Sequence, residues 1–265
     1  MTDHNEHPAS VVTYEVVGGH IAVVTLNRPH VRNAVNGELA RALETVTERV
    51  EADESIRAAI LYSSHATVFC AGADLKEVAA GRGHQCVTPG GGFAGFVDRK
   101  RRKPWIAAVR GAALAGGFEL VLACDMVVAS EDATFGLPEV KRGLFAGAGG
   151  VHRLPRALPR NVALELVATG LPLHASDAKA FGLVNRVVSA SLVLEAAIEL
   201  GMQIALNAPL SVIASIEVAR VATEMSDSAL RTLSQRVAAP VISSEDAIEG
   251  ARAFVEKREP IWQGR

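Results

Sequence analysis

The sequence predicts an α/β core followed by an all-helical C-terminal segment. Stretches rich in β-branched residues alternate with helical patterns up to about residue 190, and from Ser191 onward the apolar spacing is helical throughout. The chain has 265 residues, of which 49% are hydrophobic and 21% charged, so it has enough apolar material for a full core. We therefore expect a core over residues 1–190 and a helical segment over residues 191–265.

The first predicted elements are two antiparallel strands and a helix. Residues 11–17 and 21–26 alternate roughly between apolar and polar side chains, and Gly18 and Gly19 between them are typical of a tight hairpin turn. Asn36 suits the N-cap of a helix, because its side chain can accept a hydrogen bond from a free amide of the first turn. The apolar positions of that helix share one face and are Leu39, Leu43, Val46 and Val50.

A buried strand and a second, shorter helix follow. Residues 56–63 form an apolar run that predicts a strand covered on both sides. Residues 65–81 then predict a turn of small residues and a helix capped by Asp74. We expect the buried side of this helix to be Leu75, Val78 and Ala79.

Residues 81–103 leave two interpretations open. Residues 81–95 are rich in glycine, and residues 98–103 are mostly basic. They form either a mobile loop and then a solvated helix face, or a loop over a ligand with the basic run near a phosphate.

The central stretch, residues 105–130, contains a carboxylate that core packing does not explain. The stretch predicts a buried strand, a turn broken by glycine, a short apolar helix and a second buried strand. Glu119 lies in a run that is otherwise uncharged, where a carboxylate would lose its water. Gly116 and Gly117 open the helix before it, and bare amides at the positive end of a helix suit a negative oxygen.

The remainder of the core carries a second glutamate and a second glycine-rich turn. Residues 133–137 predict a short edge strand, followed by Pro138 and Glu139. Residues 145–154 place three glycines ahead of a helix, which makes a second potential anion pocket. The later part of the chain predicts a helix over 162–169, then a helix ended by Gly182 and a strand. Further helices are predicted to start at Pro209 and Ser226.

The composition argues against several kinds of partner. The net charge of −2 and the pI near 6.5 give no basic face, so we expect neither nucleic acid nor a membrane as partner. Cys70, Cys86 and Cys124 are widely spaced, which predicts neither a zinc site nor a disulfide framework. The polar start lacks the order of a signal peptide, and no apolar run approaches the length of a membrane span. We expect a cytoplasmic protein without a metal.

Two turns that contain glycine could act together as an oxyanion hole. Residues 71–73 and 114–117 each follow a predicted strand and precede a helix. Small side chains allow a ligand to approach the main chain closely, and each turn can aim an N–H group at one point. Two such donors stabilise the enolate that forms when a conjugated thioester is attacked.

Glu119 and Glu139 could then divide the proton transfers. Hydration of an enoyl thioester needs a deprotonated water at Cβ and a proton at Cα. Glu139 follows Pro138 among apolar neighbours, 20 positions after Glu119. If one dry pocket holds both carboxyl groups, their pKa values should be raised and coupled.

At this point the chain resembles the enoyl-CoA hydratase (crotonase) family over nearly its whole length. The motifs that carry the resemblance are NRPHVRNAV (27–35), FCAGADL (69–75), KPWIAAVRGAALAGGFEL (103–120), FGLPEVKRGL (135–144), GAGGVHRL (147–154), DAKAFGLVNRVV (177–188) and EGARAFVEKREP (249–260). Further motifs are similar to the carnitinyl-CoA dehydratase branch of the family, namely PGGGFAGF (89–96), GGFEL (116–120), SEDAIEG (244–250) and REPIWQGR (258–265).

The resemblance implies a role for each site residue. The amides of Ala73 and Gly116 would hold the thioester oxygen, Glu119 would orient and deprotonate water, and Glu139 would supply the proton at Cα. The residues that the resemblance places at the substrate and coenzyme A site are Arg32, Ala34, Ala71, Ala73, Asp74, Leu75, Gly116, Pro138, Glu139 and Lys257. Coenzyme A would be part of the substrate, so no separate cofactor is implied.

The resemblance also implies an architecture and an assembly. The fold would be a crotonase-like spiral of ββα units, and the C-terminal helices over residues 191–265 would form contacts in a homotrimer or in a hexamer built from two trimers. Lys257 would reach a neighbouring subunit's coenzyme A. Two departures from the family's pattern concern the site: Ala115 replaces a usual glycine, and Phe145 with Ala146 replaces Ile-Pro, which would reshape the acyl pocket.

Several functions compete with a hydratase, which is a hydro-lyase. An enoyl-CoA isomerase needs only one carboxylate, so the presence of Glu119 and Glu139 favours water addition. A serine peptidase of the Clp type would need a serine in the turn at 116–118, which has none. A non-catalytic acyl-CoA-binding protein would not need the paired carboxylates, and a dinucleotide enzyme would need a GxGxxG turn that the chain lacks.

Overall fold

The computed structural model describes residues 10–265, and the polar start at residues 1–9 lies outside the described residues. The strands form a six-stranded sheet, a four-stranded sheet and a two-stranded hairpin. The strands of the large sheet, in spatial order, are β1 (Val12–Val17), β2 (Ile21–Leu26), β3 (Ala58–Ser63), β7 (Trp105–Val109), β9 (Met126–Ser130) and β12 (Arg186–Val188). The strands of the small sheet are β11 (Leu173–His174), β10 (Thr134–Gly136), β8 (Ala112–Leu114) and β4 (Val68–Cys70), and the hairpin pairs β5 (Val87–Thr88) with β6 (Gly92–Phe93).

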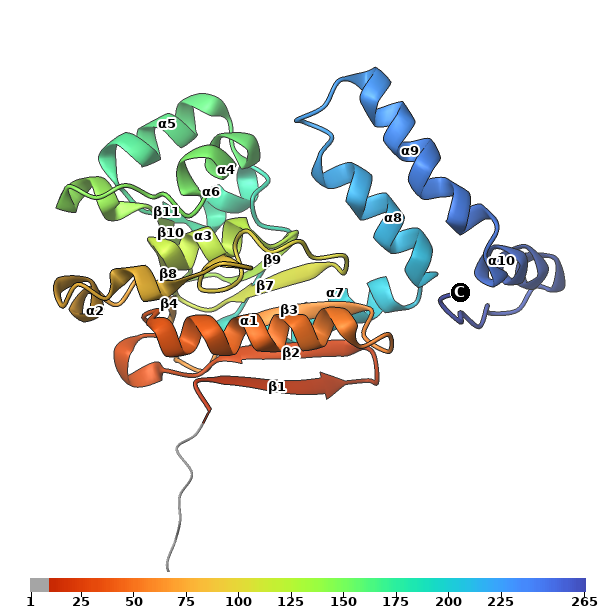
Figure 1. Ribbon diagram of the computed structural model, residues 1–265, viewed down its shortest axis with the longest axis horizontal. Coiled ribbons are helices and arrows are strands. Elements are labelled where there is room, and N and C mark those ends of the chain that lie inside the picture. Colours follow the sequence, from red (N-terminus) through yellow and green to blue (C-terminus); the bar gives the residue numbers. More distant parts are fainter. Residues whose placement is uncertain (1–9) are drawn as a thin grey trace, which may run out of the picture.

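Helices surround the two sheets and form the C-terminal end of the chain (Figure 1). The α-helices are α1 (Gly37–Ala52), α2 (Leu75–Ala79), α3 (Gly116–Leu122), α4 (Gly150–Ala157), α5 (Arg160–Thr169), α6 (Ala175–Ala180), α7 (Val193–Ala205), α8 (Pro209–Arg220), α9 (Asp227–Ile242) and α10 (Glu245–Glu256). The 3-10 helices are η1 (Pro29–Val31), η2 (Gly83–Cys86), η3 (Pro138–Arg142) and η4 (Ala190–Leu192).

The chain passes repeatedly from the large sheet to the small one. Strand β3 is followed by β4 and α2, β7 by β8 and α3, and β9 by β10 and then α4. In each unit the first strand joins the large sheet and the second joins the small sheet, with parallel pairing between units. The expected spiral of ββα units is therefore confirmed. This arrangement places the ends of β4 and β8 side by side.

The predicted first elements are also confirmed. Strands β1 and β2 pair antiparallel across a turn in which Gly18 and Gly19 have φ of 59° and 75°, and the left-handed backbone explains both glycines. The Asn36 side chain accepts a hydrogen bond of 2.9 Å from the amide of Leu39 at the start of α1. The apolar core fills the space between the two sheets and α1, and a second cluster lies between the large sheet and α7.

Three local expectations are wrong, and tertiary packing explains each. Helix α2 begins at its Asp74 cap as expected, but none of its residues is buried, because the short helix lies on the outside of the fold. The strand over residues 134–136 is not an edge, since β10 lies between β8 and β11. The basic run at 98–103 forms no helix, and Lys103 is buried with its Nζ bonded to the carbonyls of Val50 and Asp53.

The glycine-rich stretch contains regular structure and buried residues. Residues 83–93 contain η2 and the β5–β6 hairpin, and residues 93–97 are all buried. Arg101 stacks on the ring of Phe96, with 3.9 Å between the guanidinium carbon and the ring centroid. The polypeptide over residues 91–103 is therefore a strap packed against the core.

The C-terminal helices divide into one that packs on the sheet and three that project from the core. Helix α7 covers the outer face of the large sheet, whereas α8, α9 and α10 extend to one side (Figure 1). Arg220 fastens α8 to the core through two bonds of 2.7 Å to the carboxylate of Asp125. A groove of about 1210 Å³ separates α8 and α9 from the core. The proposed boundary at residue 190 stays a prediction.

Within residues 10–265 no helix taken alone has the length and apolarity to cross a membrane. In this part of the chain one pair of helices, Ala190–Ala205 and Pro209–Arg220, passes that test when the two are counted together, and the pair is bent by 108°.

Candidate active site

Two turns meet at the ends of β4 and β8. The turn at residues 71–74 follows β4, and the turn at Ala115 and Gly116 follows β8, which pairs with β4 in the small sheet. Gly72 lies so close to the second turn that a Cβ built on it would be 2.8 Å from Cβ of Ala115 and 2.9 Å from N of Gly116. The fold therefore requires glycine at position 72, both for this contact and for its φ of 88°.

The amides of Ala73 and Gly116 are free in the described part of the chain. Val35 accepts a bond of 2.8 Å from the amide of Asp74 and donates one of 2.8 Å to the carbonyl of Gly72. Because successive N–H groups of an extended chain point in opposite directions, the amide of Ala73 faces away from Val35, toward the side on which β8 lies. Neither Ala73 nor Gly116 donates its amide to any group of residues 10–265.

Ala115 holds the second turn in a strained conformation. Its φ of 52° and ψ of −129° lie in a region that side chains with a Cβ rarely adopt. The amide of Ala115 donates to the carbonyl of Gly136 at 2.8 Å, and its carbonyl accepts from Phe118 and Glu119 at 2.8 and 3.1 Å. These bonds keep the turn in place while the amide of the next residue, Gly116, stays unpaired. The fold accepts Ala115 in place of the glycine, but the backbone is strained at this position.

Glu119 lies in the first turn of α3 with only 4% of its surface exposed. Its Oε1 accepts a hydrogen bond of 2.8 Å from the amide of Gly150, the first residue of α4, and the amide of Ala148 also supports the carboxylate. The predicted anion pocket at residues 145–154 thus receives the chain's own carboxylate. Burial raises the pKa of Glu119 to about 7, and the charge of Glu139 adds to this rise, while the two amides and Arg153 oppose it.

Glu139 follows Pro138 at the start of η3 and is 9% exposed. Its Oε2 is buried and has no hydrogen-bond partner among residues 10–265. Burial raises the pKa of Glu139, against the opposing effects of its own backbone amide and of Arg142. The charge of Glu139 contributes to the raised pKa of Glu119, as expected for two carboxyl groups in one pocket, and their membership of one catalytic site stays a prediction.

Most of the other predicted site residues surround the first turn. The amide of Ala71 donates to the carbonyl of Arg32 at 3.1 Å, which joins η1 to this turn. Leu75 is 52% exposed at the start of α2, so its side chain is available to a ligand at the surface. Lys257 ends α10, which lies at the opposite end of the molecule from α2 and α5, so this chain does not bring Lys257 to its own site (Figure 1). Phe145 is 73% exposed, so it does not line a buried acyl pocket in this chain.

Two residues near the turns were missed by the sequence interpretation. Arg28 bonds to the carbonyl of Ala34 and lies 3.4 Å from Oδ2 of Asp74, so it holds η1 and the cap of α2 together. The ring of Phe93 contacts Gly116, since a Cβ on that glycine would lie 2.4 Å from the tip of the ring. A single phenylalanine inside a run of glycines is the signal that could have indicated its burial.

Comparison with known proteins agrees with this geometry. Residues 17–265 match the family model described as Enoyl-CoA hydratase/isomerase. A carnitinyl-CoA dehydratase of Proteus mirabilis is 40% identical over 252 residues, which cover 93% of this chain and 96% of that protein.

Solved structures show the same similarity. The crystal structure of an enoyl-CoA hydratase from Mycobacterium tuberculosis has a TM-score of 0.92 and 42% identity, covering 97% of this chain and all (100%) of that one. A carnitinyl-CoA hydratase from Mycobacterium avium has 47% identity and a TM-score of 0.76, with 97% and 99% coverage.

Proposed function

This chain belongs to the enoyl-CoA hydratase/isomerase family, and we propose that it catalyses the reversible addition of water to the α,β double bond of a 2-enoyl-CoA thioester. The substrate's carbonyl oxygen accepts hydrogen bonds from the amides of Ala73 and Gly116. Water adds at Cβ and a proton adds at Cα. The observation that carries the proposal is the different surroundings of the two buried glutamates.

Glu119 is suited to act as the base. Its carboxylate accepts a hydrogen bond from the amide of Gly150 at the N-terminus of α4, and this amide and that of Ala148 both favour the charged form. With a pKa of about 7, Glu119 can take a proton from water and return it near neutral pH. In the direction of hydration, Glu119 removes a proton from water as the oxygen attacks Cβ.

Glu139 is suited to act as the acid. Its Oε2 is buried without a hydrogen-bond donor among the described residues, and burial raises the pKa of the carboxyl group, so this oxygen can carry the proton that the substrate receives. The negative charge that moves from Cβ toward the thioester oxygen is held by the two amides, and Glu139 then delivers a proton to Cα. One carboxyl group that takes a proton from water and a second that delivers a proton to Cα account for one complete addition of water.

A direct assay tests the proposal. Hydration removes the conjugated thioester, so the loss of its ultraviolet absorbance with crotonyl-CoA gives the rate, and mass analysis of the product shows a gain of one water. We expect E119Q and E139Q each to lower kcat by about 10²–10⁴-fold while acyl-CoA binding is kept, because each removes a proton transfer and preserves shape. The exposed Glu165 on α5 provides a matched control, E165Q, which should have wild-type activity. Isomer formation without water gain would instead identify an isomerase, and binding without turnover would identify an acyl-CoA-binding protein.

Crotonobetainyl-CoA is the second candidate substrate, because relatives with 40% and 47% identity have names that specify carnitinyl-CoA. A trimethylammonium group is recognised by aromatic faces and negative charge. The ring of Phe93, which contacts Gly116, is such an aromatic group near the site. A kcat/KM for crotonobetainyl-CoA above that for crotonyl-CoA would support this substrate, and the reverse order would favour a simple enoyl-CoA.

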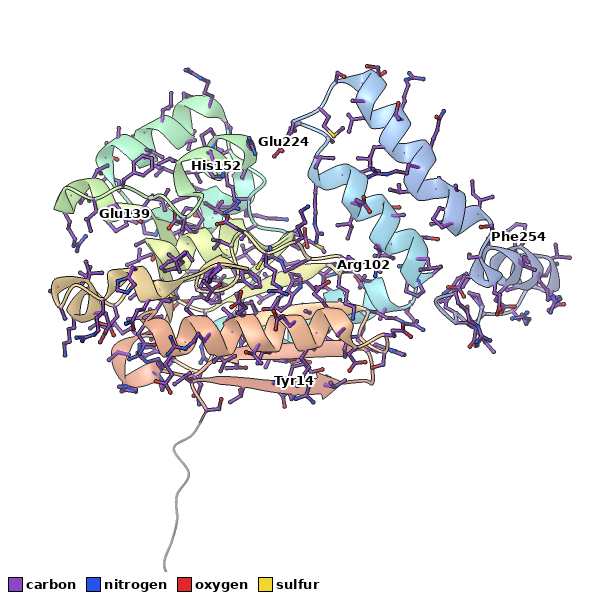
Figure 2. All side chains as sticks on the ribbon, viewed as in Figure 1. Tyr14, Arg102, Glu139, His152, Glu224 and Phe254 are labelled. Carbon is purple, nitrogen blue, oxygen red and sulfur yellow. The ribbon has the colours of Figure 1, made fainter. Side chains whose placement is uncertain are left out.

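We also propose that the C-terminal helices assemble the chain into a trimer or a hexamer. Helices α8 and α9 have no buried residue in the single chain. Phe254, labelled in Figure 2, and Val255 are 84% and 79% exposed on α10, and large apolar side chains of this kind usually mark an interface. Light scattering coupled to size exclusion should give three or six times the chain mass of 27.9 kDa, and a monomer would refute the assembly.

A further inference from the structure

The N-terminus of α4 is a cradle that the chain builds around the carboxylate of Glu119. The cradle consists of residues 148–150: the amide of Gly150 donates a hydrogen bond to the carboxylate, and the amide of Ala148 favours its charged form. Neither amide belongs to the element that carries Glu119, so the position of α4 relative to α3 decides how well the carboxylate is held. Whatever fixes residues 148–150 therefore also fixes Glu119.

Arg153, in the next turn of α4, makes hydrogen bonds to this cradle. Its Nη1 donates to the carbonyl of Ala148 at 2.9 Å, and its amide donates to the carbonyl of Gly149 at 2.8 Å. The guanidinium lies directly over Gly149, where a Cβ would be 1.9 Å from Nη1. Gly149 has a φ of 113°, so the close approach of Arg153 and the left-handed backbone both require glycine.

The same guanidinium ties the cradle to the strap over residues 91–103. Its Nη2 donates to the carbonyl of Val97 at 2.8 Å and lies 3.4 Å from Oδ1 of Asp98. Val97 is buried and follows Phe93, whose ring contacts Gly116. Arg153 thus joins the segment that holds Glu119 to the segment that packs against the oxyanion turn. Its outer side lines the groove between the core and α8–α9.

We propose that Arg153 is a positioning residue that holds residues 148–150 against Glu119 and keeps the carboxylate available as a base. Within residues 10–265 its side chain makes no hydrogen bond to the carboxylate of Glu119, so it acts through the cradle and through its charge. This inference rests on the proposed function only for its kinetic part, because the contact between the cradle and Glu119 exists in the free protein.

The charges around Glu119 set the sign of the expected pH effect. Glu139 on η3 raises the pKa of Glu119, whereas Arg153 on α4 lowers it, and Asp98 on the strap lies beside Arg153. Removal of the guanidinium therefore raises the pKa of Glu119 further above about 7. Since the base must be ionised, the acidic limb of kcat should move to higher pH, and the loss of activity should be largest at or below neutral pH.

The kinetic test compares R153Q, R153K and the control R156Q. Arg156 lies on the same helix, pairs with Glu224 and is half exposed, so its loss should leave the profile unchanged. With R153Q we expect the acidic limb of kcat for crotonyl-CoA to rise by roughly 0.5–1 pH unit. With R153K, which keeps the charge but cannot reach both carbonyls, we expect kcat at pH 8 to fall about three- to tenfold with KM unchanged. An unmoved limb in R153Q, or wild-type kcat in R153K, would overturn the proposal.

A double-mutant cycle tests the same link without catalysis. The gain in Tm that E119Q produces at pH 8 is measured in the wild-type and R153Q backgrounds. If Arg153 stabilises the ionised carboxylate, the gain in Tm at pH 8 should be larger by about 1–3 °C in the R153Q background than in the wild-type background. This difference should shrink at pH 5.5, where Glu119 is neutral in both backgrounds. Equal gains would show a merely structural arginine and would overturn the proposal. If the wild-type enzyme hydrates no enoyl-CoA, the proposed function fails, but this cycle still decides the role of Arg153.

Discussion

Gly72 is the position where one methyl group should damage the proposed oxyanion hole most directly. Its φ of 88° lies in the left-handed region, where alanine costs about 1–3 kcal/mol in strain. A Cβ at this position would lie 2.8 Å from Cβ of Ala115 and 2.9 Å from N of Gly116. Since carbon atoms prefer about 3.5–4.0 Å, the two turns must separate by roughly 0.7 Å. The separation changes the spacing of the donors at Ala73 and Gly116.

We expect Gly72→Ala to lower kcat by about 10- to 100-fold, because a shift of this size weakens at least one oxyanion bond. The free energy of unfolding should fall by about 2–4 kcal/mol from strain and contact together, which corresponds to a drop in Tm of roughly 4–12 °C. Activity is measured with crotonyl-CoA at saturating concentration, and Tm by differential scanning fluorimetry or calorimetry.

Gly81 provides a matched control. It has a φ of 76°, close to that of Gly72, but a Cβ on it would meet nothing within 4 Å. Gly81→Ala should therefore lose stability from strain alone, about 1–2 kcal/mol, and keep wild-type kcat. The reasoning fails if Gly72→Ala keeps kcat within threefold of wild type, or if Gly81→Ala loses as much activity as Gly72→Ala.

Three further predictions concern the strained turn, the buried base and the exposed helix. Ala115→Gly should raise Tm by about 2–4 °C, because the relief of about 1–3 kcal/mol of backbone strain exceeds the cost of the entropy that glycine adds to the unfolded chain. An unchanged or lower Tm would show that Ala115 is not strained. The pKa of Glu119 is raised from 4.5 to about 7, so the folded state binds the proton more tightly and stability falls as pH rises through this window. E119Q should then be more stable than wild type by up to about 3 kcal/mol at pH 8, with little difference below pH 4.5. Urea unfolding at both pH values measures the difference. An equal gain at both would show that the ionisation of Glu119 does not cause it. Phe254→Asp should dissociate the proposed assembly, because burying a charged side chain in an apolar interface costs free energy of desolvation. Analytical ultracentrifugation measures the mass of the particle, and an unchanged mass would refute a contact at Phe254.

The sequence interpretation succeeded where short-range pattern and chemistry are enough. Gly18 with Gly19, Asn36 and Asp74 act through their own turns, and each is found in the predicted role. Glu119 was identified because a charge inside an apolar run needs a reason, and it is indeed buried. The roles of Ala73, Gly116 and Glu139 in catalysis stay predictions.

Other features depend on which segments meet, and short-range pattern does not contain that information. The apolar side chains of α2 predicted a buried face, but the fold leaves that face at the surface, so Leu75 and Val78 stay exposed. One of the two interpretations of the basic run at 98–103 was a solvated helix face, yet Phe96 contacts Arg101 and the carbonyls of residues 50 and 53 accept hydrogen bonds from Lys103. A cation's partners are distant in sequence, so composition alone could not distinguish the two environments.

The order of strands and helices, the caps and the chemical types at the site follow from the residue order, because they depend on neighbours within a turn or two. Other contacts depend on the tertiary fold. They are the pairing of β4 with β8, the hydrogen bond from Gly150 to a carboxylate 31 positions earlier, and the hydrogen bonds of Arg153 to the carbonyls of Ala148 and Val97. Those contacts set the protonation of Glu119, since burial and donors from other segments, rather than its own neighbours, move its pKa.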